Sequence, residues 1–360
     1  MLQQHTLFEQ LQFDAYRFPQ PQYLGSKVTL LNWIARFIPE NASVALDAFA
    51  GSQSVSYLMK QRGLQVFTND FLAFCHQVGL ALIENGTEIL SSGEASNLFR
   101  ERSDAGTLMQ ENFAGIFFSV EEARLLDSFH TNLDELSPAQ QALALTIMNR
   151  SLTRKVIMGH FAHTQALVYA SNPVRVKRNP SIAQPLRDIF LKLLPEYNQA
   201  VFQNGKENRS FNSNALDLLP ELKKVDVAYF DPPYTDSHSD YQGFYHLTET
   251  FTRYWTDKSF INATRRYEPQ LWSGFEKKAE VEESFKKLFE RAVDIPCWLI
   301  SYNDRSYPDV ERLATLIRKH KDVTIEAKPY RNSRGGKGSV AGSHEILFVC
   351  RNKTRIFVGG

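Results

Sequence analysis

The sequence is poor in cysteine, in long apolar runs and in net charge. Its three cysteines, Cys75, Cys297 and Cys350, lie far apart without metal-ligand spacing, which disfavours structural zinc and suits a reducing compartment. No run approaches the roughly 18 apolar residues of a membrane span, and no basic start with an apolar segment marks a signal peptide. The 41 basic and 40 acidic residues nearly cancel, so no overall field indicates a polyanionic partner. We therefore expect a cytoplasmic protein without a membrane anchor.

Apolar residues make up 43% of the chain, enough for the core of one large or two modest domains. Residues 44–49 and 64–68 have the pattern of buried strands around a helical pattern at 55–61, which predicts a β-α-β unit. Further strand patterns occur at 225–230, 297–302, 323–327 and 346–350, and further helical patterns at 27–38, 71–83, 280–294 and 308–319.

Between the two strand-bearing blocks, more than a hundred residues are helical and loop-like. Alternating strands and helices predict an α/β fold with a doubly wound sheet, and the middle segment is expected to be inserted as a mainly helical lobe. We expect residues 1–85 and 205–360 to form the sheet domain and residues 86–204 to form the insert.

Polar residues follow the first two predicted strands. Ligands of open α/β sheets bind at the carboxyl ends of the strands. In "DAFAGSQ", Gly51 lets the backbone turn beside a ligand, and in "TND", Asp70 can accept hydrogen bonds from ribose hydroxyls. Ordinary turns with a capping aspartate explain these two features equally well.

The stretch "VDVAYFDPPY" ends an apolar strand pattern with a carboxylate, two prolines and an aromatic ring. The planar amino group of a nucleobase is a poor nucleophile until acceptors draw its nitrogen towards tetrahedral geometry. Asp231 supplies one acceptor, and the backbone carbonyl of Pro232, held extended by the ring of Pro233, supplies the other. Tyr234 then offers a flat face on which the base stacks. A plain strand-ending turn is the alternative.

The order of these motifs resembles the DPPY-type DNA N6-adenine methyltransferases of the alpha arrangement, in which cofactor motifs precede an insert and the catalytic motif follows it. "YLGSK", "DAFAGSQSVS", "FTNDF" and "FDPPYTD" are similar to that family's motifs, as are "GFYHLTETFTRYW", "LISYND" and "YRNSRGGKGSVAGSHEILFV". The resemblance implies a Rossmann-like methyltransferase sheet, S-adenosylmethionine as cofactor, and an insert that recognises the target sequence. The catalytic residues that it implies are Asp231, Pro232, Pro233 and Tyr234. The cofactor-binding residues that it implies are Tyr23, Gly25, Lys27, Asp47, Phe49, Ala50, Gly51, Ser52, Asn69, Asp70, Asn214, Ala215 and Asp231.

Two positions depart from the family pattern. Gln53 stands where the family usually has a second glycine, so the loop is expected to approach the cofactor less closely or through a side chain. Asn214 stands where an aspartate often contacts the adenine of the cofactor, and its amide oxygen can still accept that bond. The aromatic residues of "YHLTETFTRYW", Tyr245 among them, have a spacing more typical of a core than of a base-stacking site.

The insert contains a basic segment, because no acidic residue occurs from Leu136 to Arg187. Basic side chains neutralise phosphates without reading sequence. The expected contacts with double-stranded DNA are Arg150, Arg154, Lys155, Arg175, Lys177 and Arg178, together with Arg334 and Lys337 in a glycine-containing loop. A solvated basic face and a simple hairpin tip are the alternatives. His160 and His163 lack an acidic or thiol partner, so we expect no metal site.

The predicted function is site-specific methylation of adenine N6 in DNA, by direct transfer to a base turned out of the duplex. A separately encoded restriction endonuclease is a possible partner. Two alternatives stay open. The chain can be a cytosine-N4 methyltransferase, although Asp231 favours adenine, or a DNA-binding specificity module whose cofactor pocket has degenerated at Gln53 and Asn214.

Overall fold

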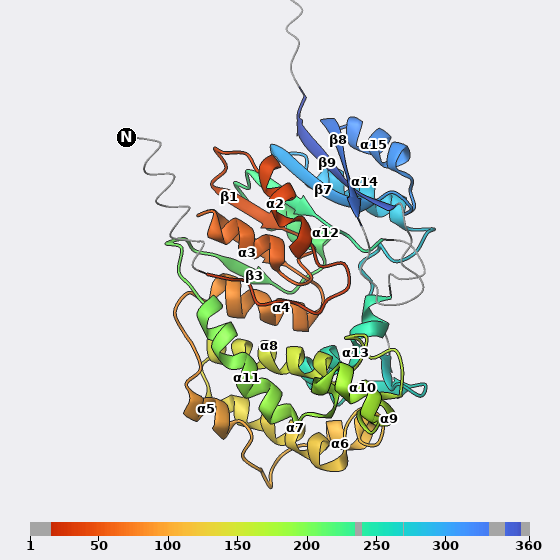
Figure 1. Cartoon of the computed structure of the whole chain (residues 1–360). Helices are drawn as coiled ribbons and strands as arrows, with labels where there is room; N and C mark the ends of the chain where they lie inside the picture. Colours follow the sequence, from red (N-terminus) through yellow and green to blue (C-terminus); the bar gives the residue numbers. More distant parts are fainter. Residues whose placement is uncertain (1–15, 235–239, 269, 331–342, 354–360) are drawn as a thin grey trace, which may run out of the picture.

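A seven-stranded sheet forms the centre of the computed structural model, which describes residues 16–234, 240–268, 270–330 and 343–353 (Figure 1). The strand order is β3-β2-β1-β4-β7-β9-β8, and β5 pairs with β6 in a separate hairpin. The strands are β1 Val44–Asp47, β2 Gln65–Asn69, β3 Arg209–Phe211, β4 Val227–Phe230, β5 Ser259–Ile261, β6 Arg266–Glu268, β7 Cys297–Asn303, β8 Lys321–Tyr330 and β9 Ser343–Asn352.

The strand directions place the carboxyl ends of β1 and β4 next to each other. Strands β3, β2, β1, β4 and β7 are parallel, whereas β9 runs antiparallel to both β7 and β8. From β1 the chain first proceeds outward to β2 and β3, and then returns to β4 on the other side of β1. This reversal of strand order opens a crevice at the carboxyl ends, where ligands of such sheets bind.

Helices cover both faces of the sheet. The helices before the insert are α2 Leu31–Ile34, α3 Ser54–Gln61 and α4 Ala73–Gly79, which continues as a π-helical turn over Leu80–Glu84. Those of the insert are α5 Ser92–Asn97, α6 Leu108–Phe113, α7 Val120–Asn132, α8 Pro138–Arg154, α9 Ala166–Ala170, α10 Pro173–Arg178 and α11 Leu186–Ala200. Those after it are α12 Ala215–Leu218, α13 Tyr241–Arg253, α14 Val281–Arg291 and α15 Val310–Arg318.

Strand β4 is buried on both sides, as expected for a central parallel strand. Val227 and Tyr229 belong to an apolar cluster that extends into α3 and the helical insert. Ala228 and Phe230 belong to a second cluster, with residues of α12, α14 and α15. Alternate side chains thus pack on opposite faces. The strand ends where Pro232 and Pro233 have no N–H to donate to a neighbouring strand.

The helical insert lies against the sheet domain rather than at the end of a linker (Figure 1). Its longest helix is α8. Ser137 caps the start of this helix and forms a capping box with Gln140, and Pro138 lies in the first turn. Helix α8 packs on α4 and on α11, and the apolar cluster below the sheet continues into it. The division of the chain at residues 85 and 205 stays a prediction.

The predicted α/β fold with a doubly wound sheet and a helical insert is confirmed. No strand of the central sheet lies between residues 70 and 208, all of which the structure describes. The short strand β3 and the β5–β6 hairpin were not predicted, and the helix predicted at 71–83 divides into α4 and the π-helical turn. In the part of the chain that the structure describes, every helix is too short or too polar to span a bilayer.

Candidate active site

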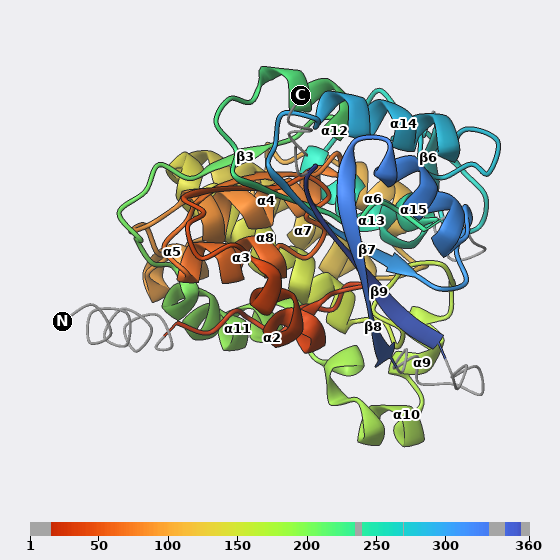
Figure 2. The same cartoon turned by 90° about the horizontal axis from the view of Figure 1, so that it is seen from above.

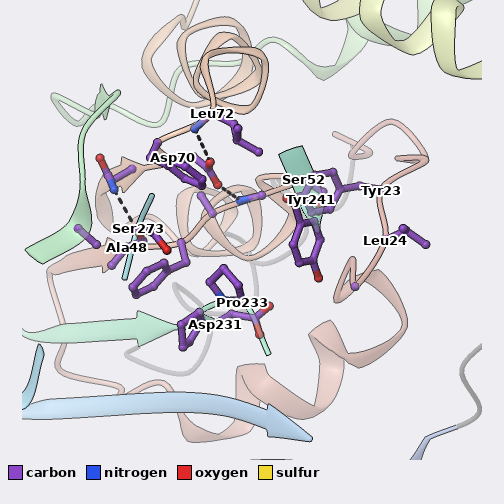
Figure 3. A pocket seen from close by; sticks show the side chains of 18 of the residues that line it. Tyr23, Leu24, Ala48, Ser52, Asp70, Leu72, Asp231, Pro233, Tyr241 and Ser273 are labelled. Carbon is purple, nitrogen blue, oxygen red and sulfur yellow. Dashed lines mark hydrogen bonds between the residues drawn. The ribbon is translucent and has the colours of Figure 1, made fainter. Parts of the chain in front are cut away.

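A cavity of about 520 Å³ opens at the carboxyl ends of β1, β2 and β4. Figure 3 shows Asp231 and Pro233 at the tip of β4, with Ser52 and Asp70 across the cavity and Tyr23 and Tyr241 at its side. Every predicted cofactor-binding residue except Asn214 lines this cavity, and so do the four predicted catalytic residues.

Asp47 is the last residue of β1, and only one of its two carboxylate oxygens has a hydrogen-bond partner among the described residues. Its Oδ2 accepts hydrogen bonds from the backbone N–H of Ser56 at 3.1 Å and from the Ser56 hydroxyl at 2.6 Å. Its Oδ1 is buried and has no hydrogen-bond partner among the described residues. Burial is the main reason that the pKa of Asp47 is raised to about 7. The unpaired oxygen is an acceptor that a cationic or hydroxyl group in the cavity can satisfy.

The loop after β1 is shaped by Gly51 and held by Asp70. Gly51 has φ +48°, and a Cβ there would lie 2.8 Å from the ring of Tyr23, so only glycine fits. The N–H of Gly51 donates to Asp70 Oδ2 at 2.8 Å, and that of Leu72 donates to Asp70 Oδ1 at 2.9 Å (Figure 3). Burial raises the pKa of Asp70 to about 7. Each oxygen keeps a second lone pair for a ligand.

The two positions that depart from the family pattern are used for contacts within the protein. Gln53 adopts φ +67°, and its amide accepts from the Thr68 hydroxyl at 2.5 Å and donates to the Cys75 carbonyl at 3.2 Å. Asn214 caps α12 by accepting from the N–H of Leu216. Neither side chain lines the cavity. Of the two expectations for this loop, contact through the Gln53 side chain has no support in the structure, and Asn214 acts here as a helix cap.

Stacked tyrosines fix the position of the segment that precedes α2. The ring of Tyr23 stacks on Tyr241 at 5.7 Å and on Tyr245 at 5.1 Å between centroids. The Tyr245 hydroxyl accepts a hydrogen bond from the N–H of Leu24 at 2.8 Å. Tyr245 is buried, as its sequence spacing predicts, but it also positions a wall of the cavity.

At the end of β4, two carboxylates, a lysine and a tyrosine form one network. Asp231 Oδ2 lies 2.8 Å from Lys27 Nζ, and Asp231 Oδ1 accepts from the Tyr234 hydroxyl at 2.8 Å. The second carboxylate is Glu345, near the start of β9, whose Oε1 lies 3.2 Å from Lys27 Nζ and 3.1 Å from Tyr234 Oη. Residues from three distant parts of the chain thus meet at the cavity.

Charges within this network set the protonation of its members. Burial would lower the pKa of Lys27, but Asp231 and Glu345 together raise it well above its usual value. Burial raises the pKa of Glu345, against the opposing effect of Lys27. Burial, with the two carboxylates, also raises the pKa of Tyr234 well above its usual value. Lys27 therefore carries its charge, and the Tyr234 hydroxyl keeps its proton.

The sequence analysis quoted the segment that contains Glu345 but gave that residue no role. It also missed cavity-lining residues that come from loops, from α13 and from β6. Those residues include Ser213, Tyr241, Arg266, Trp272 and Glu276. The signal that was available for Glu345 is an acidic residue at the start of an otherwise apolar strand, "EILFV".

The basic residues of the insert fall into two groups. Arg150 donates to the Gln20 carbonyl at 3.1 Å and to the Gln22 side chain at 2.5 Å, and burial lowers its pKa. Lys155 is buried and pairs with Glu122 at 2.9 Å and with the Gln184 carbonyl at 2.8 Å. The predicted DNA contact of Lys155 is therefore corrected, because its ammonium is used inside the protein.

The other group is exposed. Arg175, Lys177 and Arg178 lie on α10, a short helix without a buried residue, which projects from the body of the molecule in Figure 2. Arg175 stacks over the Tyr169 ring at 3.9 Å. Arg154 is half-buried at the end of α8. Arg334 and Lys337 lie outside the described residues.

His160 and His163, for which the sequence analysis expects no metal, pack among other rings. The ring of His160 packs on Phe244 at 4.9 Å, and it lies 6.0 Å from the ring of His163. Within the described ranges, no group of three or more histidine, cysteine or acidic side chains is arranged to hold a metal ion.

Comparison with known proteins assigns this chain to a family. A model described as D12 class N6 adenine-specific DNA methyltransferase matches residues 23–294. Type II methyltransferase M2.HphI of Haemophilus parahaemolyticus is 32% identical over 345 residues, which cover 94% of this chain and 99% of that protein. Modification methylase LlaI of Lactococcus lactis subsp. lactis is 25% identical over 352 residues, 91% of this chain but 53% of its own length. Type II methyltransferase M.CviAII of Paramecium bursaria Chlorella virus 1 is 20% identical over 342 residues, 91% of this chain and 97% of that protein.

The resemblance inferred from the motifs is thereby confirmed, and adenine is favoured over the cytosine-N4 alternative. The matched range begins at Tyr23 and includes β1, the insert and the DPPY sequence. The chain belongs to the D12 class of N6 adenine-specific DNA methyltransferases.

Proposed function

We propose that this enzyme transfers a methyl group from S-adenosylmethionine to N6 of an adenine that has been turned out of double-stranded DNA. The observation that carries the proposal is the position of Asp231, which ends β4 on a cavity whose other walls are the β1 and β2 loops. One cavity thus adjoins both a site for a nucleoside-bearing donor and an acceptor for a base amino group.

The chain's own residues fit the methyl donor. The unpaired Asp47 Oδ1 suits the ammonium of the methionine part, and Asp70 suits the ribose hydroxyls. The space that Gly51 leaves open lets the ligand approach the backbone. When bound, S-adenosylmethionine supplies a methyl group on a positively charged sulfur, and transfer forms a nitrogen–carbon bond, breaks the sulfur–carbon bond and releases one proton from the amino group.

The residues at the end of β4 act on the base. Asp231 and the carbonyl of Pro232 accept the two amino N–H bonds, and the carboxylate stabilises the positive charge that develops on nitrogen. Tyr234 lies beside the base and limits its orientation. Turning the base out of the duplex costs a few kcal/mol, on the order of the unstacking energy.

Helix α10 is the proposed DNA-facing element of the insert. Its three basic side chains are exposed, and Val168 and Val174 beside them are 67% and 62% exposed. A helix that buries nothing within its own chain, and that joins positive charge to apolar side chains, suits the phosphates and base edges of a duplex. We keep Arg154 in this proposed surface and leave Lys155 out.

The biological setting is proposed on the same grounds. The relatives are named type II methyltransferases and modification methylases, which supports a role beside a separately encoded restriction endonuclease. The three free, buried cysteines suit the cytoplasm.

Modification sequencing tests the proposal most directly. DNA from a methylation-deficient host that expresses this chain is expected to carry N6-methyladenine in one short sequence context. N4-methylcytosine in its place, or no modification at all, would contradict the proposed reaction. Calorimetry with S-adenosylmethionine complements this test, since a degenerate specificity module predicts no heat of binding.

A further inference from the structure

Glu345 is a buried carboxylate beside the partly exposed Asp231, and the assigned motifs give it no function. Its side chain is 3% exposed. Its Oε1 lies within hydrogen-bond reach of Lys27 Nζ and of Tyr234 Oη, the same two groups that contact Asp231. Two carboxylates therefore share one pair of donors.

The tyrosine has only one proton to donate. Tyr234 Oη lies 2.8 Å from Asp231 Oδ1 and 3.1 Å from Glu345 Oε1. When the hydroxyl donates to Asp231 Oδ1, it takes one of the two lone pairs of that oxygen and competes there with the amino group of the base. When it donates to Glu345, that lone pair becomes available, and a small rotation of one O–H bond makes the exchange.

The lysine has more acceptors than it can use at once. An ammonium has three N–H bonds. The acceptors around Lys27 Nζ are the Gly25 carbonyl at 3.2 Å, Tyr234 Oη at 3.1 Å, Asp231 Oδ2 at 2.8 Å and Glu345 Oε1 at 3.2 Å. If Lys27 moves away from Asp231, three acceptors remain for its three N–H bonds. Glu345 then remains as its ionic partner.

We propose that Glu345 is a positioning residue, which takes over Lys27 and Tyr234 when the target base enters and so frees both oxygens of Asp231. The inference rests on the proposed function. Charge supports it, because two carboxylates and one lysine leave the network with one excess negative charge if both acids are ionised. After the exchange, that charge is on Asp231, where positive charge develops on the amino nitrogen during transfer.

Replacing Glu345 by glutamine tests the proposal. The amide keeps the shape but not the charge, so Lys27 stays with Asp231. We expect kcat to fall about 10–100-fold, since a charged hydrogen bond to Asp231 then opposes the entry of the base. KM for S-adenosylmethionine and for DNA should stay within about threefold, a split that general damage to the fold does not produce. A kcat within about twofold of wild type would overturn the proposal.

Two further variants keep the test decisive if Glu345→Gln folds poorly. Glu345→Asp retains the charge on a shorter side chain and is expected to recover part of the lost kcat; equal losses in both variants would count against a role for charge. In the double variant Lys27→Met with Glu345→Gln, the loss should be smaller than the product of the single losses, because Glu345 acts largely through Lys27. Multiplicative losses would exclude that route.

Asp127 offers a matched control for the loss of any buried carboxylate. It is buried in α7 and accepts the N–H groups of Met109 and Gln110 in the helical insert. Asp127→Asn is expected to lower the melting temperature and leave kcat unchanged. Wild-type enzyme in the same assay separates the two levels of inference. If the wild-type enzyme fails to methylate adenine, the proposed function is wrong. If wild type methylates adenine and Glu345→Gln has the same kcat, only the role of Glu345 is wrong.

Discussion

The two ends of the cavity hold carboxylates in different ways. At the cofactor end, Asp70 receives backbone N–H groups, and Asp47 receives a backbone N–H and a serine hydroxyl. At the transfer end, the donors to Asp231 among the described residues are the side chains of Lys27 and Tyr234, and no backbone N–H is among them. Backbone donors are fixed by the fold, whereas side-chain donors can exchange partners. The difference suggests a rigid half that binds and a rearranging half that reacts.

The largest expected effect comes from removing the acceptor at the transfer end. Asp231→Ala should reduce kcat by about 10³-fold, because the developing positive charge loses its carboxylate and the amino group loses one acceptor. Binding of S-adenosylmethionine should change only a few-fold. The fold should tolerate the change, since Lys27 keeps Glu345 as a partner. Single-turnover methylation and calorimetry measure the two quantities, and near-full activity would contradict the role of Asp231.

A smaller effect is expected at the proposed DNA-facing surface. There, the exposed basic side chains of α10 differ from the buried Lys155 at the end of α8. Changing Arg175, Lys177 and Arg178 together to alanine should lower duplex affinity about tenfold or more and reduce the slope of log K against log salt by about 3. The melting temperature should not change, because these side chains are exposed.

Lys155→Met is the matched control for that variant. Lys155 is buried against Glu122, so its loss leaves a carboxylate without its cation and should lower the melting temperature. Its salt slope should equal that of wild type. A changed slope for Lys155→Met, or an unchanged slope for the α10 variant, would reverse the assignment of the two groups.

The cofactor end predicts a pH-dependent affinity. In the free enzyme the pKa of Asp47 is raised to about 7, chiefly by burial. An ammonium beside it favours the ionised form, so binding must expel a proton below pH 7 but not above it. Affinity for S-adenosylmethionine should therefore fall as pH is lowered from about 7, by at most about tenfold per pH unit.

Asp47→Asn is the control for this titration, because it has no proton to expel. Its affinity should be weaker than that of wild type near pH 7 and should fall less steeply between about pH 7 and 5.5, where Asp70, whose pKa burial also raises to about 7, still titrates. Calorimetry in two buffers of different ionisation enthalpy should show more proton release by wild type than by the variant. Equal pH dependence in both proteins would assign the titration to another group.

Local patterns predicted most of the fold and many of the residues that line the cavity, whereas long-range partners escaped prediction. The stretch from Val227 to Phe230 reads as a buried strand because every side chain in it is apolar, and the two prolines mark its end. The pairing of Lys155 with Glu122, and the arrival of Glu345 beside Asp231, depend on chain segments 33 and more than 100 residues apart. No local period encodes such contacts, and the three residues of β3 are too few to show one.

The smallest expected effect on cofactor binding concerns Gln53, whose side chain joins Thr68 of β2 to the Cys75 carbonyl of α4. Its positive φ costs about 1 kcal/mol in a residue with a side chain, and its two buried hydrogen bonds contribute about 1 kcal/mol each. Gln53→Ala loses the bonds and keeps the strain, so we expect the free energy of unfolding to fall by about 2–3 kcal/mol. Gln53→Gly also loses the bonds but relieves the strain, and should be about 1 kcal/mol more stable than the alanine variant.

Chemical denaturation of the two variants measures these differences, and calorimetry supplies the decisive comparison. Because the Gln53 side chain does not line the cavity, cofactor affinity should stay within a few-fold of wild type in both. A large loss of affinity in Gln53→Gly, with little change in stability, would mean that the loop depends on this side chain to bind the cofactor. The cofactor end would then owe its rigidity to an exchangeable side chain, as the transfer end does, and the contrast between the two halves would disappear.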